Sequence, residues 1–351
     1  MKKVLLGMSG GVDSSTSAIL LQKQGYEVIG CTMMLVDKGD INNDLNVIDA
    51  KKVCDKLGIK HYAFDFREKF EEYVINNFID TYNKGKTPNP CVICNKYVKF
   101  KMLYDKAKEL GIEYIATGHY AKVEFSNKYN QNILRKSKSI KKDQSYFLYN
   151  IDKEILDYIV LPLSEFETKD EIRQLAKEEG LQVYSKPDSE DICFIPNGDY
   201  ISFLKSKNVK FTNGNFIDLN GKTIYKHEGI QKYTIGQRRG LELPVTFSTP
   251  RYVVRFKNND IILGEEKDIY LKELIASDIN MLVDFKFEDS FECYAKIRYA
   301  TKEAKAKVYK QDDNKYKVVF EDNQRAVTKG QAIVFYTEDG IVLGGGTITD
   351  C

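Results

Sequence analysis

The stretch from Gly7 to Ser15 combines residue types that suit the binding of an anion. It reads GMSGGVDSS, follows the apolar residues 4–6 and precedes a segment of helical spacing that begins at Thr16. A strand, a glycine turn and a helix start leave backbone N–H groups unpaired at the positive end of the helix dipole. Glycines let the backbone approach a ligand closely, and serine hydroxyls add hydrogen-bond donors. The loop is therefore predicted to bind phosphate, the alternative being a serine-capped helix that binds nothing.

Asp13 distinguishes this loop from the two commonest phosphate motifs. The Walker loop needs a lysine after its last glycine and the dinucleotide fingerprint needs G-x-G-x-x-G, and the stretch has neither. An aspartate inside the loop repels a phosphate unless a cation lies between them. Because Mg²⁺ bridging Asp13 to a pyrophosphate removes this conflict, a pyrophosphate site with magnesium is predicted.

Cys91 and Cys94 form the second group whose spacing suits chemistry. They lie in the segment TPNPCVICN at residues 87–95, whose prolines and asparagines predict a loop, with a basic helix following over residues 96–110. Two cysteines at this spacing are able to share a metal or to hold and release sulfur. A structural zinc site needs two more ligands, and the sequence has no second pair. Cys94 lies near the predicted helix start, where the dipole is expected to lower its thiol pKa.

Cys193 and His119 are single residues, and each allows a functional and a structural interpretation. Cys193 is flanked by apolar residues, which suit either a closed reactive pocket or a small buried side chain. His119 follows Gly118 at the end of an apolar segment, where it is either a base or substrate contact or a structural residue. The cysteines at positions 31, 54 and 293 lie in strand or helix patterns and are predicted to be core.

Alternating elements over residues 1–118 position these groups. Strands are predicted at 27–34, 61–66 and 112–117, and helices at 46–57 and 68–82. Such alternation predicts a parallel sheet covered on both faces, with ligands beyond the carboxyl ends of its strands, where Ser9, Met33 and Gly118 fall. Residues 154–159 and 168–179 are predicted to be helical, the latter starting with a capping box. After about residue 207, short alternating strands with Asn/Gly turns predict one or two small β-barrels.

Composition sets the broad class of the protein. The 351 residues suffice for two or three domains, and the net charge of only +2 produces no global field that would attract nucleic acid. Local basic runs at residues 96–101 and 135–142 are read as solvated surface when taken alone. The apolar run at residues 4–6 is too short for the core of a signal peptide, and no apolar run is long enough for a membrane span. We expect a cytoplasmic protein with reduced thiols and no membrane partner.

Several blocks together resemble the tRNA-specific 2-thiouridylases, which thiolate the wobble uridine of certain tRNAs. They are residues 7–15, 87–90 with Cys94-Asn95, 116–121, 142–148, 192–195 and 233–241. The resemblance spans almost the whole chain and implies an α/β protein. It implies an N-terminal adenine-nucleotide α-hydrolase-like parallel sheet in a catalytic domain over residues 1–200, a small central domain over 201–275 and a C-terminal β-barrel over 276–351.

The resemblance also implies an ATP-dependent reaction in two stages. The C2 oxygen of the uracil attacks the α-phosphate of ATP, and sulfur then replaces AMP at C2. Mg²⁺ would assist the departure of pyrophosphate. A sulfur-donor protein would load Cys193 with a persulfide, Cys94 would act as the nucleophile, and Asp13 would also take part.

The residues carried over by this resemblance form a nucleotide site and a tRNA site. The implied nucleotide-binding residues are Gly7, Met8, Ser9, Gly10, Gly11, Val12, Asp13, Ser14, Met33 and Gly118. The implied tRNA-binding residues are Asn89, Pro90, Cys91, His119, Lys142, Asp143, Gln144, Arg298, Tyr299 and Gln331. A base that undergoes chemistry must leave its stack, and side chains such as Tyr299 and Arg298 suit a splayed base.

Cys91 departs from the family pattern, because many bacterial members have aspartate there. Three thiolates, from Cys91, Cys94 and Cys193, are able to hold a [4Fe–4S] cluster with one iron open for sulfide. The sequence therefore leaves two sulfur routes open, the persulfide and the cluster. Two rival functions stay open: an ATP-dependent amidating ligase, which shares the opening loop but needs no cysteine pair, and a non-catalytic RNA-binding module with a nucleotide-sensing domain.

Overall fold

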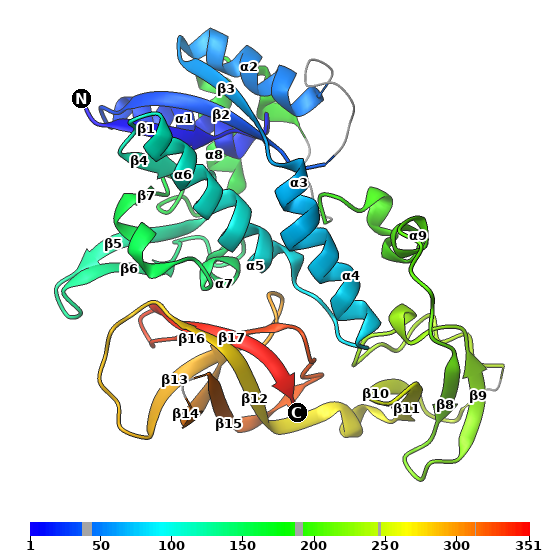
Figure 1. Ribbon diagram of the computed structural model, residues 1–351. Helices are drawn as coiled ribbons and strands as arrows, with labels where there is room; N and C mark the ends of the chain where they lie inside the picture. Colours follow the sequence, from blue (N-terminus) through cyan, green and yellow to red (C-terminus); the bar gives the residue numbers. More distant parts are fainter. Residues whose placement is uncertain (37–43, 187–191, 245–246, 313) are drawn as a thin grey trace.

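The computed structural model describes residues 1–36, 44–186, 192–244, 247–312 and 314–351. Figure 1 shows a sheet with flanking helices at the N-terminal end of the chain, a closed barrel below it, and a small sheet to one side. This arrangement confirms the predicted fold class. No helix within the described residues has the length and apolar character needed to cross a lipid bilayer.

Five strands form the N-terminal sheet, in the order β3-β2-β1-β4-β7 and all parallel. They are β1 Lys3–Gly7, β2 Glu27–Met34, β3 Lys60–Asp65, β4 Tyr114–Ala116 and β7 Ile159–Val160. β1 pairs with β2 on one side and with β4 on the other, so the strand order reverses beside β1. Open parallel sheets bind ligands beyond the carboxyl ends of their strands at such a reversal, which here is the Gly7 end of β1.

Helices pack around this sheet and match most of the predicted ones. They are α1 Val12–Lys23, α2 Leu45–Leu57, α3 Arg67–Phe70, α4 Asn76–Asn83 and α8 Lys169–Glu178, with the π-helical turn Glu71–Ile75 joining α3 to α4. Asp44 caps α2 by accepting a hydrogen bond from Asn46 N–H at 2.8 Å, and Gly58 ends it at φ +67°. Thr168 and Glu171 form the predicted capping box at the start of α8.

The helix that carries Cys91 and Cys94 begins earlier than predicted. It comprises α5 Pro90–Cys94, the π-helical segment Asn95–Met102 and α6 Leu103–Glu109. Asn89 caps α5, because its side-chain oxygen accepts a hydrogen bond from Val92 N–H at 3.5 Å, and Pro90 occupies the first helical position. The prediction that both cysteines lie in a loop is wrong, since the Asn-Pro pair starts this helix.

The remaining elements build two β units and their connections. The connections are the hairpin β5 Ala121–Ser126 and β6 Gln131–Lys136, the short helices α7 Ser145–Leu148 and α9 Tyr200–Ser206, and the 3₁₀ turn Lys153–Tyr158 where a helix was predicted. The central sheet, in the order β10-β11-β8-β9, contains β8 Gly214–Ile217, β9 Thr223–His227, β10 Tyr252–Lys257 and β11 Asp260–Gly264. The closed barrel contains β12 Tyr270–Met281, β13 Ser290–Lys296, β14 Ala304–Asp312, β15 Lys315–Arg325, β16 Ala332–Tyr336 and β17 Val342–Asp350.

The barrel and the N-terminal sheet share one hydrophobic core. Leu5 and Ile115 of the sheet belong to the same buried cluster as Val334 and Tyr336 of barrel strand β16. Tyr146 joins the two units by donating its hydroxyl proton to the carbonyl of Ala332 at 2.9 Å. Because this interface is apolar and buried, the barrel is a fixed part of the surroundings of the site.

Candidate active site

The loop at the end of β1 has the geometry of an anion cradle. Gly10 adopts φ +69°, and a Cβ added there would lie 2.8 Å from Cβ of Asp49, so this turn requires glycine. Gly11 caps α1 in an extended conformation. Ser14 Oγ donates to the carbonyl of Gly11 at 3.2 Å and accepts from Ser9 N–H at 3.2 Å. The loop is therefore shaped by its own backbone and hydroxyls rather than by a ligand.

Two other predicted nucleotide-binding residues lie against this loop. A Cβ added to Gly118 would lie 3.0 Å from the backbone nitrogen of Ser14, so glycine at this position lets the end of β4 touch the start of α1. A Cβ added to Gly7 would lie 3.1 Å from Cε of Met33, which places the Met33 side chain over the end of β1. The structure thus brings together the loop, Met33 and Gly118 at the strand reversal.

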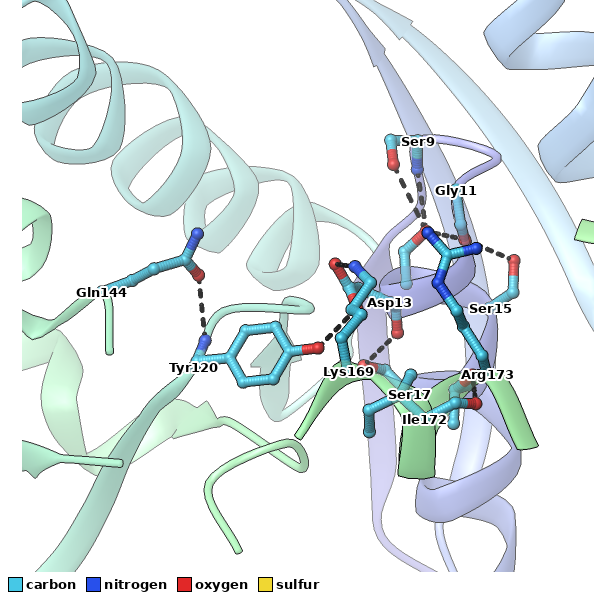
Figure 2. Close-up of polar contacts among 12 residues, drawn as sticks. Ser9, Gly11, Asp13, Ser15, Ser17, Tyr120, Gln144, Lys169, Ile172 and Arg173 are labelled. Atoms are coloured by element: carbon cyan, nitrogen blue, oxygen red, sulfur yellow. Dashed lines mark hydrogen bonds and ion pairs between the residues drawn. The ribbon is translucent and has the colours of Figure 1, made fainter. Parts of the chain in front are cut away.

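Asp13 has two partners on other elements (Figure 2). Its Oδ1 accepts a hydrogen bond from the Tyr120 hydroxyl at 2.7 Å, and its Oδ2 pairs with Lys169 Nζ at 2.5 Å. The Lys169 ammonium also lies 5.9 Å from the centre of the Tyr120 ring. Since both carboxylate oxygens already have donors from the chain, Asp13 does not form a magnesium site from protein groups alone. Nor do the described residues contain any group of three His, Cys, Asp or Glu placed to hold a metal.

Sequence analysis missed the cations that surround the loop. Lys169 begins α8, and Figure 2 shows Arg173 of the same helix beside the start of α1. Arg173 donates to the carbonyl of Tyr184 at 2.7 Å. Lys186 donates to Asp49 at 2.9 Å and to the carbonyl of Gly10 at 3.1 Å. These residues follow the loop at long range in the chain, so no local pattern connects them to it.

The thiols of Cys91, Cys94 and Cys193 interact electrostatically, although Cys193 is distant in sequence. Cys94 is buried in one apolar cluster with Phe194 and Ile195, the residues that follow Cys193. Cys91 and Cys193 are exposed. Burial raises the pKa of Cys94 to about 12, and only Lys99 opposes this effect. The predicted lowering of this pKa by the helix dipole is therefore wrong, because desolvation outweighs the dipole.

Lys99 is the cation that faces these thiols. It follows Cys94 by five residues, which is the hydrogen-bond spacing of the π-helical segment between them. Burial opposes the charge of Lys99, but the three thiols together raise its pKa. The same lysine affects His119, whose pKa is lowered to about 3 by burial and by the charge of Lys99. His119 is thus a neutral imidazole at pH 7, with Nδ1 at 2.8 Å from the hydroxyl of Thr117.

The structure gives no support for a [4Fe–4S] cluster on Cys91, Cys94 and Cys193, because the described residues contain no group of three His, Cys, Asp or Glu placed to hold a metal ion. Three ligands of one cluster must converge on one small volume. Cys91, Cys94 and Cys193 are within electrostatic reach of one another, but no such group in the described part of the chain meets the geometry of a metal site. Cys94 also belongs to the buried apolar cluster that contains Phe194.

Several predicted tRNA-binding residues bind other parts of the chain. Gln331 donates from Nε2 to the carbonyls of Thr87 and Pro88 at 3.1 and 2.9 Å. Arg298 donates to the carbonyls of Ile235 and Ala326, both at 3.0 Å. These side chains position the segment before α5 and join the barrel to the central domain.

The segment 142–144 has both buried and exposed members. Asp143 is buried and accepts hydrogen bonds from Ser137 N–H at 2.9 Å and from Ser145 Oγ at 2.7 Å. Burial raises its pKa, although these hydrogen bonds oppose the shift. Lys142 is exposed. Gln144 is tied to Tyr120, because its Oε1 accepts from Tyr120 N–H at 2.9 Å.

Tyr299 lies in an aromatic group at the surface. Its ring is 4.5 Å from that of Phe147, and the ammonium of Lys296 lies 5.4 Å from its centre. With 37% of the residue exposed, one side of this group is open to a ligand. A flat cationic surface of this kind suits a nucleobase.

Comparison with known proteins covers nearly the whole chain. Three domain-family models match consecutive parts of it: a tRNA methyl transferase HUP domain at residues 2–197, a tRNA methyl transferase PRC-barrel domain at 201–265, and an aminomethyltransferase beta-barrel domain at 271–348. The first of these models matches more than half of the chain.

Relatives of similar length carry a common description. The tRNA-specific 2-thiouridylase MnmA of Clostridioides difficile (strain 630) is 46% identical over 357 residues, which cover 99% of this chain and 98% of the relative. The protein of that name from Acetivibrio thermocellus is 47% identical over 359 residues, with 99% of each chain covered. A solved 4-thiouridine synthetase in complex with RNA and ATP is more distant, with a TM-score of 0.40, 18% identity and coverage of 59% of this chain and 50% of that one. The near-complete coverage at this identity shows that the chain belongs to the tRNA-specific 2-thiouridylases, enzymes that transfer sulfur to tRNA.

Proposed function

We propose that the chain activates a tRNA uridine with ATP and then replaces the C2 oxygen with sulfur carried by cysteine. The observation that carries the sulfur step is that Ile192 and Phe194, which flank Cys193, pack in the same apolar cluster as Cys94 although they are distant in sequence. Both thiols also lie within electrostatic reach of Lys99. The wobble position of the anticodon is the proposed target, as the family resemblance implies.

The loop at Gly7–Ser14 is the proposed site for the phosphates of ATP. A urea-like oxygen leaves poorly, whereas AMP is a good leaving group, so attack of the C2 oxygen on the α-phosphate prepares the exchange. Backbone N–H groups at the start of α1 would stabilise the charge on departing pyrophosphate. Met33 and Gly118, which lie against the loop, would contact the adenosine. Mg²⁺ enters this proposal as part of the substrate MgATP, coordinated chiefly by phosphate oxygens.

Sulfur is proposed to arrive from a donor protein as a persulfide on the exposed Cys193. The outer sulfur attacks C2 of the adenylated uracil, and the bond between C2 and the AMP oxygen breaks with both electrons leaving on AMP. The Cys94 thiolate then attacks Sγ of Cys193, so the S–S bond breaks and its electron pair stays on the sulfur of 2-thiouridine. A Cys94–Cys193 disulfide remains, which an external dithiol reduces by thiol exchange.

The proposed tRNA contacts surround this site. Tyr299, Lys142 and the helix start at Asn89 are the proposed points of direct contact, because Tyr299 and Lys142 are exposed and Asn89 is half-buried at the surface beside Cys91. Arg298 and Gln331, which donate hydrogen bonds to backbone carbonyls, are proposed to act by positioning the segments they hold. The persulfide route is preferred over the cluster because the three thiols do not form a metal site.

Two measurements on purified protein test the proposal. Wild-type protein with tRNA and ATP is expected to release pyrophosphate, and with a persulfide donor to form 2-thiouridine by nucleoside mass spectrometry. Cys94→Ser and Cys193→Ser are expected to abolish 2-thiouridine while ATP binding persists. Cys351→Ser, an exposed cysteine at the end of the chain, is the matched control and should keep full activity.

Other outcomes would overturn separate parts of the proposal. Full thiolation by both cysteine variants would exclude the sulfur step. Release of no pyrophosphate from wild-type protein would exclude adenylation. Anaerobically prepared protein that contains iron and acid-labile sulfide, and that thiolates tRNA only in that form, would replace the persulfide with a cluster.

A further inference from the structure

The pair formed by Asp13 and Lys169 resolves the electrostatic conflict of the loop. An aspartate inside an anion-binding loop opposes a polyphosphate by Coulomb repulsion. Lys169 Nζ lies 2.5 Å from Oδ2 of Asp13, with only 13% of the lysine side chain and 30% of the aspartate side chain exposed. The chain therefore brings its own cation to the place where a metal ion was predicted from the sequence.

The position of Lys169 is set by the start of α8. Thr168 caps this helix in a capping box with Glu171, so Lys169 occupies the first helical residue of a well-defined end. The next turn packs against α1, where Thr16 Oγ1 donates to the carbonyl of Ile172 at 3.5 Å. Packing and capping thus hold the backbone of Lys169 beside the loop, and its flexible stem lets the ammonium move within reach of it.

Tyr120 completes the arrangement around Asp13, as Figure 2 shows. Its hydroxyl donates to Oδ1 at 2.7 Å, so the two carboxylate oxygens have one neutral and one cationic partner. An ammonium has three donors, so Lys169 is able to keep Asp13 and donate to a phosphate oxygen at the same time. Binding of a nucleotide therefore needs no separation of the buried pair.

The wider charge balance favours an anionic ligand. Besides Lys169, the cations Arg173 and Lys186 lie around the loop, and Lys186 contacts the carbonyl of Gly10 and Asp49. Among the residues around the loop that the structure describes, these three cations accompany the carboxylates of Asp13 and Asp49. Positive charge beside a helix N-terminus attracts phosphate.

We propose that Lys169 is a nucleotide-binding residue that neutralises Asp13 in the free enzyme and donates to a phosphate oxygen of bound ATP. This inference rests on the proposed use of ATP and adds a residue to its site. The side chain touches both the loop and the substrate, so its loss affects binding of the nucleotide directly.

Binding and kinetics of three variants test this role. Lys169→Met is expected to raise the Kd of a non-hydrolysable ATP analogue, measured by calorimetry at saturating Mg²⁺, by about tenfold or more, and to raise the KM for ATP. Lys169→Arg keeps the charge and should lose less affinity. Lys177→Met removes an exposed lysine from the last turn of the same helix and is expected to bind the analogue like wild type. Thermal unfolding of each variant shows whether it is folded.

The result that overturns the role of Lys169 differs from the result that overturns the reaction. If folded Lys169→Met binds the analogue as tightly as wild type, or if it only lowers Tm, the lysine is structural. If wild-type protein binds the analogue but releases no pyrophosphate with tRNA, adenylation fails while a loss of binding in Lys169→Met still supports the nucleotide contact.

Discussion

At the scale of single residues, the chemistry of the cysteine site depends on a balance between burial and one cation. Desolvation raises the pKa of Cys94 to about 12, which leaves few thiolates at neutral pH. The charge of Lys99 lowers this pKa, and the three thiols raise the pKa of Lys99 in return. Because so small a fraction of this thiol is ionised, its reactivity depends on a cation that stabilises the thiolate.

Lys99→Met is expected to make Cys94 less reactive. Because the pKa of Cys94 lies above the working range, its thiolate fraction, and with it the rate of alkylation by iodoacetamide, rises with pH from 7 to 10. Loss of the cation raises this pKa further, so the rate at a fixed pH of 8 should fall several-fold. Mass spectrometry of the peptide that contains Cys94 measures the rate. Lys101→Met, whose ammonium pairs with Asp105, is the control; equal rates in both variants would contradict the role of Lys99.

His119 is expected to stay neutral wherever the enzyme works. Its pKa is lowered to about 3 by burial and by Lys99, so the imidazole takes up a proton only well below the usual range of histidine. NMR titration of its ring protons should show no charge change between pH 5 and 9. A midpoint near 6.5 would show that the ring is open to water and would restore it as a candidate base.

At the scale of elements, a short segment after the end of β4 connects the proposed nucleotide loop to the segment proposed to bind tRNA. Tyr120 follows the end of β4, and its hydroxyl binds Asp13 of the loop while its backbone binds Gln144. In addition, the backbone N–H of Gln144 donates a hydrogen bond to the carbonyl of Tyr120 at 2.7 Å. One residue thereby links the proposed nucleotide loop to a segment proposed to bind tRNA.

Tyr120→Phe is expected to weaken this link while keeping the ring. A hydrogen bond to a carboxylate contributes about 1.5–3 kcal/mol, so the rate of pyrophosphate release with tRNA should fall by roughly tenfold or more. The quantity compared between variants is the rate of pyrophosphate release with tRNA divided by the rate without tRNA. Tyr114→Phe, a tyrosine of β4 whose hydroxyl accepts a hydrogen bond from Lys2, is the matched control. An unchanged ratio in Tyr120→Phe would mean that the tyrosine does not connect the two segments.

At the scale of the whole molecule, the barrel and the central domain hold the segment that starts the cysteine helix. Gln331 binds the carbonyls of Thr87 and Pro88, and the N–H of Thr87 donates to the carbonyl of Lys329 at 2.9 Å. The hydroxyl of Thr87 lies 2.9 Å from that of Thr234 in the central domain. The start of α5 is thus fixed by groups from both other units.

Gln331→Ala is expected to loosen this segment without unfolding the barrel. Two carbonyls lose their donor, at a cost of about 1–3 kcal/mol. Hydrogen exchange of the amides at residues 87–95 should become faster. Thiolation of tRNA should fall, while the Tm of the protein should change little. Gln324→Ala, whose amide binds only the nearby carbonyl of Asp322, is the control from the same barrel. Unchanged exchange at these amides would refute the positioning role.

Local patterns were sufficient for much of the fold. The helix predicted at residues 46–57, the strand at residues 27–34 and the change to short β-strands after residue 207 follow from short-range periodicity and turn residues. The signal for the helix start at Pro90 is also local. Interpreting Asn89 as an N-cap and Pro90 as the first helical residue would have predicted this start correctly.

The sequence by itself determined the family, the fold class and the loop at residues 7–15, because a strand, a glycine turn and a helix start are contiguous and need no partner to be recognised. The tertiary structure decided which groups face that loop and the cysteines. Lys169 pairs with Asp13, and Cys193 approaches Cys94, only because segments distant in the chain pack together. It also decided the pKa of Cys94, since desolvation depends on the surrounding residues rather than on the helix that carries the thiol.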